Sequence, residues 1–121
     1  MSHQIVGDAG LSAENLGALR ASLREQRQFR LEQLRRFSEP ATDRAVRVRQ
    51  QRSASQREVH IKLTASARMV LADVEAALER MDQGTYGTCH RCERPIAVER
   101  LQVVPQARFC GPCHQVRGAD R

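Results

Sequence analysis

Residues 84–113 read GTYGTCHRCERPIAVERLQVVPQARFCGPC and contain all four cysteines of the chain. The cysteines form two pairs in a C-x2-C-x17-C-x2-C pattern. Two thiolates that stand two residues apart can hold one edge of a tetrahedral zinc ion, and a second pair closes the shell without leaving a position for water. The pattern therefore predicts one structural Zn2+ bound by Cys89, Cys92, Cys110 and Cys113.

Two other interpretations of the cysteines have less support. Disulfides need an oxidising compartment, but residues 1–10 read MSHQIVGDAG, without the charged and apolar regions of a signal peptide. A thioredoxin-like C-x-x-C needs strands that alternate with helices, whereas the residues before Cys89 have a helical pattern. We therefore expect a cytoplasmic protein with reduced thiols, in which His90 and His114 are bystanders beside the metal.

Composition limits the size of the core. The 121 residues include one tyrosine, three phenylalanines and no tryptophan, so stability must come from helix pairing and from the metal. Eleven arginines lie between Arg20 and Arg57 against four acidic residues, whereas the segment from Glu58 to Gln83 is slightly acidic. This asymmetry indicates contact with nucleic acid or with an acidic protein surface, and a solvated helix face explains it equally well.

Two helices are predicted before the cysteines. The first begins at Ser12, whose side chain can cap it, and ends near Phe37 and Ser38, because Pro40 cannot continue a helix. The second ends before Gly84, which suits a left-handed C-cap. Its apolar residues recur at alternating gaps of four and three, which is typical of a coiled-coil seam. The seam consists of Leu63, Ala67, Val70, Val74, Ala77 and Met81.

The start of the second helix has two candidates. A cap at Thr42 or Asp43 gives a helix of about forty residues, whereas Ser55, with Glu58 in a capping box, gives a length close to that of the first helix. We favour a well-packed helix from Ser55, with Asp43 to Arg52 helical but poorly packed, since equal lengths bring the apolar positions of the two helices together. In that register Leu16 lies near Met81, Leu23 near Val74 and Leu34 near Leu63.

The predicted fold is mainly α, an antiparallel helical hairpin (coiled coil) followed by a small C-terminal four-cysteine zinc finger. We expect a flexible N-terminus at residues 1–10, the hairpin at 11–83 with its tip around 38–55, and the finger at 84–121. Short extended pieces are expected between Pro95 and Val104. Tyr86 and Phe109 are expected to join a small core around the zinc.

The finger resembles that of the DksA/TraR family of bacterial transcription regulators. The resemblance implies a coiled coil that binds RNA polymerase directly, enters its secondary channel and modulates initiation, without sequence-specific contact to DNA. We further expect a monomer with no membrane contact and no enzymatic activity, because the metal shell is saturated. The matching residues are Gly84 to Cys89, Cys92, Pro95-Ile96, Glu99 to Leu101, Pro105 and the closing Cys110-x-x-Cys113.

In this family the hairpin tip has an aspartate, two residues, a second aspartate, one residue and an alanine. Asp43 and Ala45 match the second half of that pattern, and Glu39 stands one residue further away than the first aspartate. The register above also brings arginines to the outermost surface, where they can meet carboxylates or phosphates. The predicted polymerase-binding tip consists of Glu39, Asp43, Ala45, Arg44, Arg47, Arg49 and Arg52.

Two further points concern ligands. In the best-known members of the family, basic residues between the coiled coil and the finger help to hold guanosine tetraphosphate. Asp73 and Val104 stand at those places here and supply no positive charge, so the resemblance does not extend to this nucleotide. The alternative function is a nucleic-acid-binding zinc protein that uses the arginine-rich arm 20–57, whose binding would weaken steeply with salt.

Overall fold

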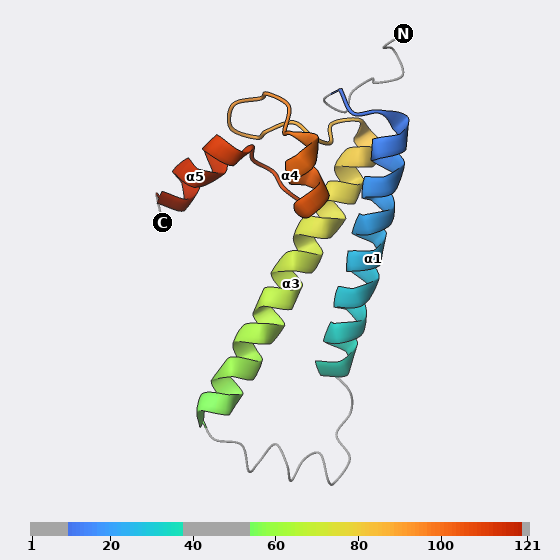
Figure 1. The fold of residues 1–121 in the computed structure, drawn as a ribbon. Coiled ribbons are helices and arrows are strands. Elements are labelled where there is room, and N and C mark those ends of the chain that lie inside the picture. The colour runs from blue at the N-terminus through green and yellow to red at the C-terminus, as the bar shows by residue number, and fades with distance from the viewer. Residues whose placement is uncertain (1–9, 38–53, 120–121) are drawn as a thin grey trace.

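The computed structural model describes residues 10–37 and 54–119. This part of the chain contains four helices, α1 (Ala13–Phe37), α3 (Ala54–Gln83), α4 (Val98–Val103) and α5 (Gly111–Ala119). Figure 1 shows α1 and α3 side by side in opposite directions, with α4 and α5 at the end where α1 begins and α3 ends. The predicted fold class is confirmed. None of the described helices is both long and apolar enough to span a membrane.

The expected tip lies outside the described residues. The alternative start of the second helix at Thr42 or Asp43 also falls there, whereas the described part of α3 begins at Ala54, one residue before Ser55. The tip residues concerned are Glu39, Asp43, Ala45, Arg44, Arg47, Arg49 and Arg52.

The caps predicted for the end of the hairpin next to the finger are confirmed. Ser12 Oγ accepts a hydrogen bond of 3.0 Å from a backbone amide in the first turn of α1. At the end of α3, Gly84 has a φ of 77°, and its amide donates to the Met81 carbonyl at 3.2 Å. The next amide, of Thr85, donates to the Arg80 carbonyl at 2.9 Å. These two bonds form a Schellman motif, whose left-handed residue glycine adopts without strain.

The hairpin seam is closed near the finger. One hydrophobic cluster contains residues of α1, α3 and the finger. The core at the base of the hairpin is therefore continuous with the core of the finger. The hairpin residues buried in this cluster are Leu11, Leu19, Leu23, Val74, Ala77 and Met81.

A ring contact further along the hairpin agrees with the predicted register. The rings of Phe37 and His60 meet edge to face, with centroids 5.1 Å apart. Phe37 lies three residues beyond Leu34, and His60 lies three residues before Leu63. Because the helices are antiparallel, a register that aligns Leu34 with Leu63 also aligns Phe37 with His60.

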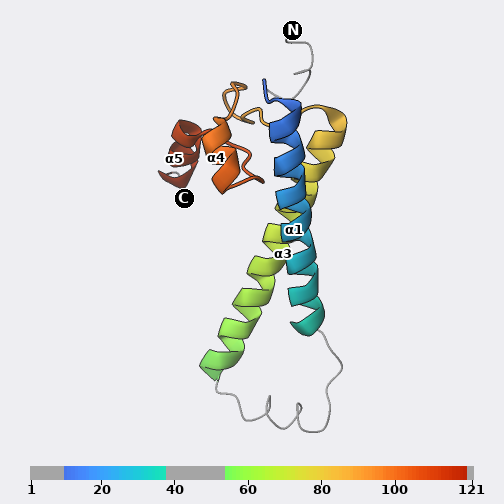
Figure 2. The same cartoon turned by 45° about the vertical axis from the view of Figure 1, so that its right-hand side comes forward.

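The prediction that Leu63 is part of a buried seam is wrong. Its exposed fraction is 52%, and that of Val59, one turn earlier, is 56%. Figure 1 shows why, since α1 and α3 are further apart at the end away from the finger, and in Figure 2 the two helices cross near mid-length and separate below that point. The spacing of apolar residues shows that Leu63 and Val74 lie on the same face of α3. Burial of that face also requires α1 to remain close along its whole length.

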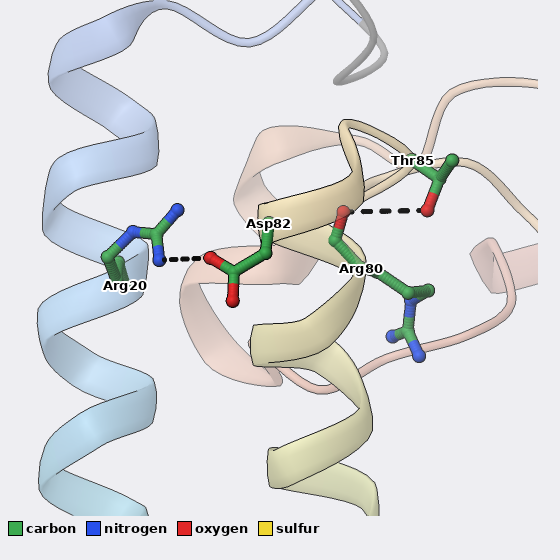
Figure 3. A network of polar contacts seen from close by, with 4 residues as sticks. All are labelled: Arg20, Arg80, Asp82 and Thr85. Atoms are coloured by element: carbon green, nitrogen blue, oxygen red, sulfur yellow. Dashed lines mark hydrogen bonds and ion pairs between the residues drawn. The ribbon is translucent and has the colours of Figure 1, made fainter.

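Two ion pairs link α1 and α3. Arg20 Nη1 lies 3.0 Å from Asp82 Oδ1, as Figure 3 shows, and Arg27 Nε lies 3.0 Å from Glu75 Oε2. A step of seven residues along α1 is thus matched by seven residues back along α3. All four side chains are substantially exposed, so each pair contributes about 0–1 kcal/mol and mainly favours this alignment.

The segment expected to be extended between Pro95 and Val104 instead contains α4, so that prediction is wrong. The amides of Arg100 and Leu101 both donate to the Ala97 carbonyl, at 3.0 Å and 3.1 Å. The valines of this segment favoured strand on propensity. Helical turns, however, bring Leu101, which is fully buried, onto the same face as Val98, and this burial overrides the propensity.

Val74 and Leu63 offer a matched pair of substitutions on the same helix. Val74→Asp places a carboxylate at a position with no exposed surface and should lower the free energy of unfolding by roughly 3 kcal/mol or more. Leu63→Asp, at a half-exposed position, should cost about 0.5 kcal/mol. Urea unfolding followed by far-ultraviolet circular dichroism measures both. Equal effects of the two substitutions would contradict the uneven closure of the seam.

Candidate metal centre

The structure brings the four cysteines together. Their Sγ atoms all lie within 4.8 Å of one another, although the two pairs are separated by seventeen residues. All four are free thiols, so the disulfide alternative has no support. Cys89 and Cys113 are buried, while Cys92 and Cys110 lie nearer the surface. One residue of each pair therefore faces the core and the other faces outward.

The spacing of the sulfur atoms fits zinc. In a tetrahedral shell with Zn–S bonds of about 2.3 Å, the sulfur atoms stand about 3.8 Å apart. The Sγ atoms of Cys92 and Cys110, which bridge the two pairs, are 3.8 Å apart. The centre holds one structural zinc ion, whose four sulfur ligands leave no open position for a substrate or for water.

The first cysteine pair lies in a tight turn. The Cys89 amide donates to the Arg94 carbonyl at 2.8 Å, and the Glu93 amide donates back to the Cys89 carbonyl at 3.0 Å. Glu93 has a φ of 63°, the left-handed conformation that closes the turn. An isolated antiparallel bridge between Thr88 and Pro95 holds the two ends of the turn together. This backbone pattern points both thiols of the pair to the same side.

The second pair stands at the start of α5. Cys110 immediately precedes this helix, and its carbonyl accepts the His114 amide at 2.8 Å. Cys113 lies in the first turn of α5, so a helical turn brings its Sγ back beside that of Cys110. The two cysteine pairs thus have the same C-x-x-C spacing in different local structures, a tight turn for the first pair and the start of a helix for the second.

The thiols do not ionise equally without a metal. Burial raises the pKa of Cys89, but backbone amides of Cys92, Cys110 and Arg91 outweigh it and lower the pKa to about 6. The Cys113 amide lowers the pKa of Cys110, yet burial and the neighbouring sulfur atoms raise it to about 11. Four thiolates this close repel one another, so a dication is needed to hold all four in the ionised state.

Arg91 supports the sulfur cluster from outside. Its backbone amide donates to Cys89 Sγ at 3.4 Å, and its guanidinium Nη1 donates to Cys113 Sγ at 3.6 Å. One residue thus contacts a sulfur of each cysteine pair. Four thiolates with one Zn2+ carry a net charge of −2, which a guanidinium stabilises. The sequence did not identify this residue, because nineteen arginines give no pattern by which one can be singled out.

Aromatic and aliphatic side chains connect the centre to the hairpin. Tyr86 has no exposed surface, and its hydroxyl donates to the Pro105 carbonyl at 2.7 Å. Arg100 Nε donates to the Phe109 carbonyl at 2.9 Å and fixes the chain just before the second cysteine pair. Tyr86, Ile96 and Leu101 belong to the same cluster as the hairpin base. The predicted core around the metal is therefore present, and it continues into the hairpin.

The two histidines of the finger are outside the sulfur cluster. The ring of His90 packs edge to face on Phe109, with centroids 6.1 Å apart. Burial lowers the pKa of His90, and the charges of Arg80 and Arg108 lower it further, which favours a neutral ring. His114 is exposed on α5. Neither histidine replaces a cysteine in the four-sulfur group.

Comparison with known sequences identifies the finger. Residues 84–117 match the model of the prokaryotic dksA/traR C4-type zinc finger. A stretch of 43 residues is 42% identical to an uncharacterized protein of Aquifex aeolicus strain VF5, covering 36% of this chain and 30% of that protein. A stretch of 42 residues is 46% identical to general stress protein 16O of Bacillus subtilis strain 168, covering 35% of this chain and 26% of that protein. The chain thus aligns with less than a third of either relative.

Two solved structures have the same fold. Transcription factor DksA2 from Pseudomonas aeruginosa is similar with a TM-score of 0.62 and 24% identity, over 89% of this chain and 86% of that chain. The DnaK suppressor protein from Agrobacterium tumefaciens C58 is similar with a TM-score of 0.61 and 29% identity, over 89% of this chain and 98% of that chain. The family model covers the finger alone, while the likeness in fold extends over the hairpin.

Loss of zinc should affect the finger first. Tyr86 is the only tyrosine, and the chain has no tryptophan, so tyrosine fluorescence reports on the finger core alone. Removal of zinc by a chelator, or Cys110→Ser, should abolish the folded tyrosine signal because the metal–sulfur bonds that join the two cysteine pairs are lost. Most of the helical circular dichroism should remain, with a lower melting temperature, since hairpin and finger share one cluster. Helical and tyrosine signals that are lost together on chelation would contradict this order.

Arg91→Ala tests the guanidinium contact with Cys113. The substitution leaves the backbone amide in place, so only the side-chain interaction is lost. Release of zinc to a chromogenic chelator should be about tenfold faster, the usual size of an outer-shell effect. Arg94→Ala, an exposed arginine in the same turn, serves as the control. An equal release rate in Arg91→Ala and Arg94→Ala would show that the guanidinium does not stabilise the centre.

Proposed function

We propose that this chain, a member of the DksA/TraR family by its finger and its fold, is a transcription regulator that binds RNA polymerase directly through the hairpin. The tip around residues 38–55 enters the secondary channel of the polymerase and modulates initiation. The observation that carries this proposal is the two-helix fold shared with the two solved structures over 89% of the chain.

The shape of the hairpin supports entry into a channel. The 30 residues of α3 extend over about 45 Å at 1.5 Å per residue, and among the described elements only α1 accompanies this helix away from the finger. Two helices form the narrowest rod that still buries an apolar seam. The finger sits at the end where α1 begins and α3 ends, where it widens the molecule and can limit the depth of insertion.

The charges of α1 weigh against the alternative of a nucleic-acid-binding arm. Arg20 and Arg27 pair with carboxylates of α3, and Arg35 pairs with Glu32 on α1 itself. Phosphate binding would have to compete with these contacts, although each is weak. Three arginines in the described part of this segment are thus held in ion pairs inside the chain, and a polymerase-binding hairpin needs no free cationic face there.

The zinc has a structural part in this proposal. Its saturated sulfur shell offers no site for catalysis, so the regulator acts by contact and not as an enzyme. Reduced cysteines also suit the cytoplasm, where RNA polymerase works. The finger fixes the base of the hairpin through the shared cluster and thereby sets the direction in which the tip projects.

Two sets of substitutions test the roles proposed for the tip. Asp43→Asn removes one negative charge and keeps the size of the side chain. It should leave binding to core polymerase intact in a pull-down and reduce the effect on transcription in vitro. Replacement of Arg47, Arg49 and Arg52 by Ala should mainly weaken binding and its dependence on salt.

The wild-type chain provides the first control. If it fails to retain core polymerase in the pull-down, the proposal of direct binding is wrong. If Asp43→Asn keeps full transcriptional activity while the triple arginine variant loses it, the acidic tip has no role. A basic tip would then be the functional element.

A further inference from the structure

A second apolar stripe runs along α3 outside the seam with α1. Its members recur at gaps of four, four, three and four residues, the spacing of a helix-packing face. The seam residues Ala67, Val74 and Ala77 are buried against the rest of the chain, whereas every member of the second stripe is exposed. The stripe consists of Ile61, Ala65, Met69, Ala72 and Ala76.

The stripe is not explained by helix propensity alone, because two of its members are large apolar side chains that are exposed. Ile61 and Met69 have exposed fractions of 66% and 68%, large values for apolar side chains of this size. The three alanines between and beyond them would let another helix approach closely, because the distance between packed helices depends on the side chains at the contact. An exposed face of this kind marks a protein interaction surface.

The charges of α3 indicate which partner fits. Residues 54–68 contain Arg57, Lys62 and Arg68 against one acidic residue. Residues 69–83 contain four acidic residues against Arg80 alone. This order is opposite to the one that the helix macrodipole favours, so the stability of the helix itself does not explain it. The acidic residues are Asp73, Glu75, Glu79 and Asp82.

The midpoint of the apolar stripe coincides with the point at which α3 changes from basic to acidic. The stripe runs from Ile61 to Ala76, and its midpoint lies between Arg68 and Met69, where the charge of the helix also changes sign. A second α3 placed antiparallel about this point would set the basic half of each helix against the acidic half of the other. A parallel arrangement would set like charges together. Of these two arrangements of α3 copies, the antiparallel one is complementary in both respects.

We propose that the outer stripe of α3 is a self-association surface, through which two copies of this chain pair antiparallel about a two-fold axis near Met69. In that arrangement Lys62 of each copy approaches Asp73 of the other on the same flank. Glu75 and Asp82 already pair with α1 within each copy. The dimer would cover one face of the hairpin, so monomer and dimer present different surfaces to any other partner.

The contact is short, which sets the expected strength. The stripe spans about four helical turns, and a single helix pair of this length buries less than the roughly 1,600 Å² of a standard stable interface. The monomer that we expected from the sequence therefore remains in exchange with the dimer. Association should strengthen at low ionic strength, because opposite charges lie close to solvent on both flanks.

Sedimentation velocity of the full-length, zinc-loaded chain over a range of concentrations tests the proposal. The wild-type chain should shift from monomer to dimer as concentration rises, and Met69→Glu should weaken association about tenfold or more, because two carboxylates meet at the axis. Phe29→Glu, which changes an exposed apolar residue of α1 away from the stripe, should leave association unchanged. Circular dichroism checks that each variant is folded.

Charge reversal provides a second, independent readout. Lys62→Glu should weaken the dimer, and the double variant Lys62→Glu with Asp73→Lys should restore it, because the opposite charges then meet with exchanged positions. Restoration supports the antiparallel register. A wild-type chain that remains monomeric at every concentration, or a Met69→Glu chain that dimerises as the wild type does, would overturn the proposal. A double variant that dimerises no better than Lys62→Glu would overturn the register.

Discussion

The coordination of one zinc ion by four thiolates is the constraint on which the rest of the structure depends. Sulfur atoms this close repel when all four are ionised, and a dication between them joins the turn at Cys89 to the start of α5. The core that forms around them includes Tyr86 and Leu101 and continues into the base of the hairpin. The metal therefore stabilises more than the finger, because the first turns of the coiled coil share its cluster.

The hairpin becomes less tightly packed with distance from that cluster. Leu23 and Val74 have no exposed surface, whereas Leu63, further along the same seam, is half exposed. The buried contacts gather at the end of the hairpin where the finger contributes side chains to the same cluster. In the proposed function this gradient places the stable end away from the polymerase and leaves the distal helices less constrained.

The ion pairs between α1 and α3 mainly favour the alignment of the two helices. The pairs Arg20–Asp82 and Arg27–Glu75 lie near the surface and contribute little free energy, yet they occur at matching steps along antiparallel helices and oppose a slip in register. In the acidic half of α3, Glu75 and Asp82 pair with arginines of α1, whereas no ion pair with α1 is found for Asp73 or Glu79 among the described residues. The charge pattern of one helix can thus serve two contacts, one within the chain and one with a second copy.

Much of the fold followed from local signals. The four-cysteine spacing, the cap at Ser12 and the left-handed turn at Gly84 act through neighbouring residues, so the sequence alone determined the zinc site and the two helix ends next to the finger. Three features depended on tertiary structure. The helical form of α4 arises because Leu101 is buried, the exposure of Leu63 arises because the helices diverge, and the contact of Arg91 with Cys113 arises because two distant turns meet. Each is a property of residues far apart in the chain, whose approach no local pattern encodes.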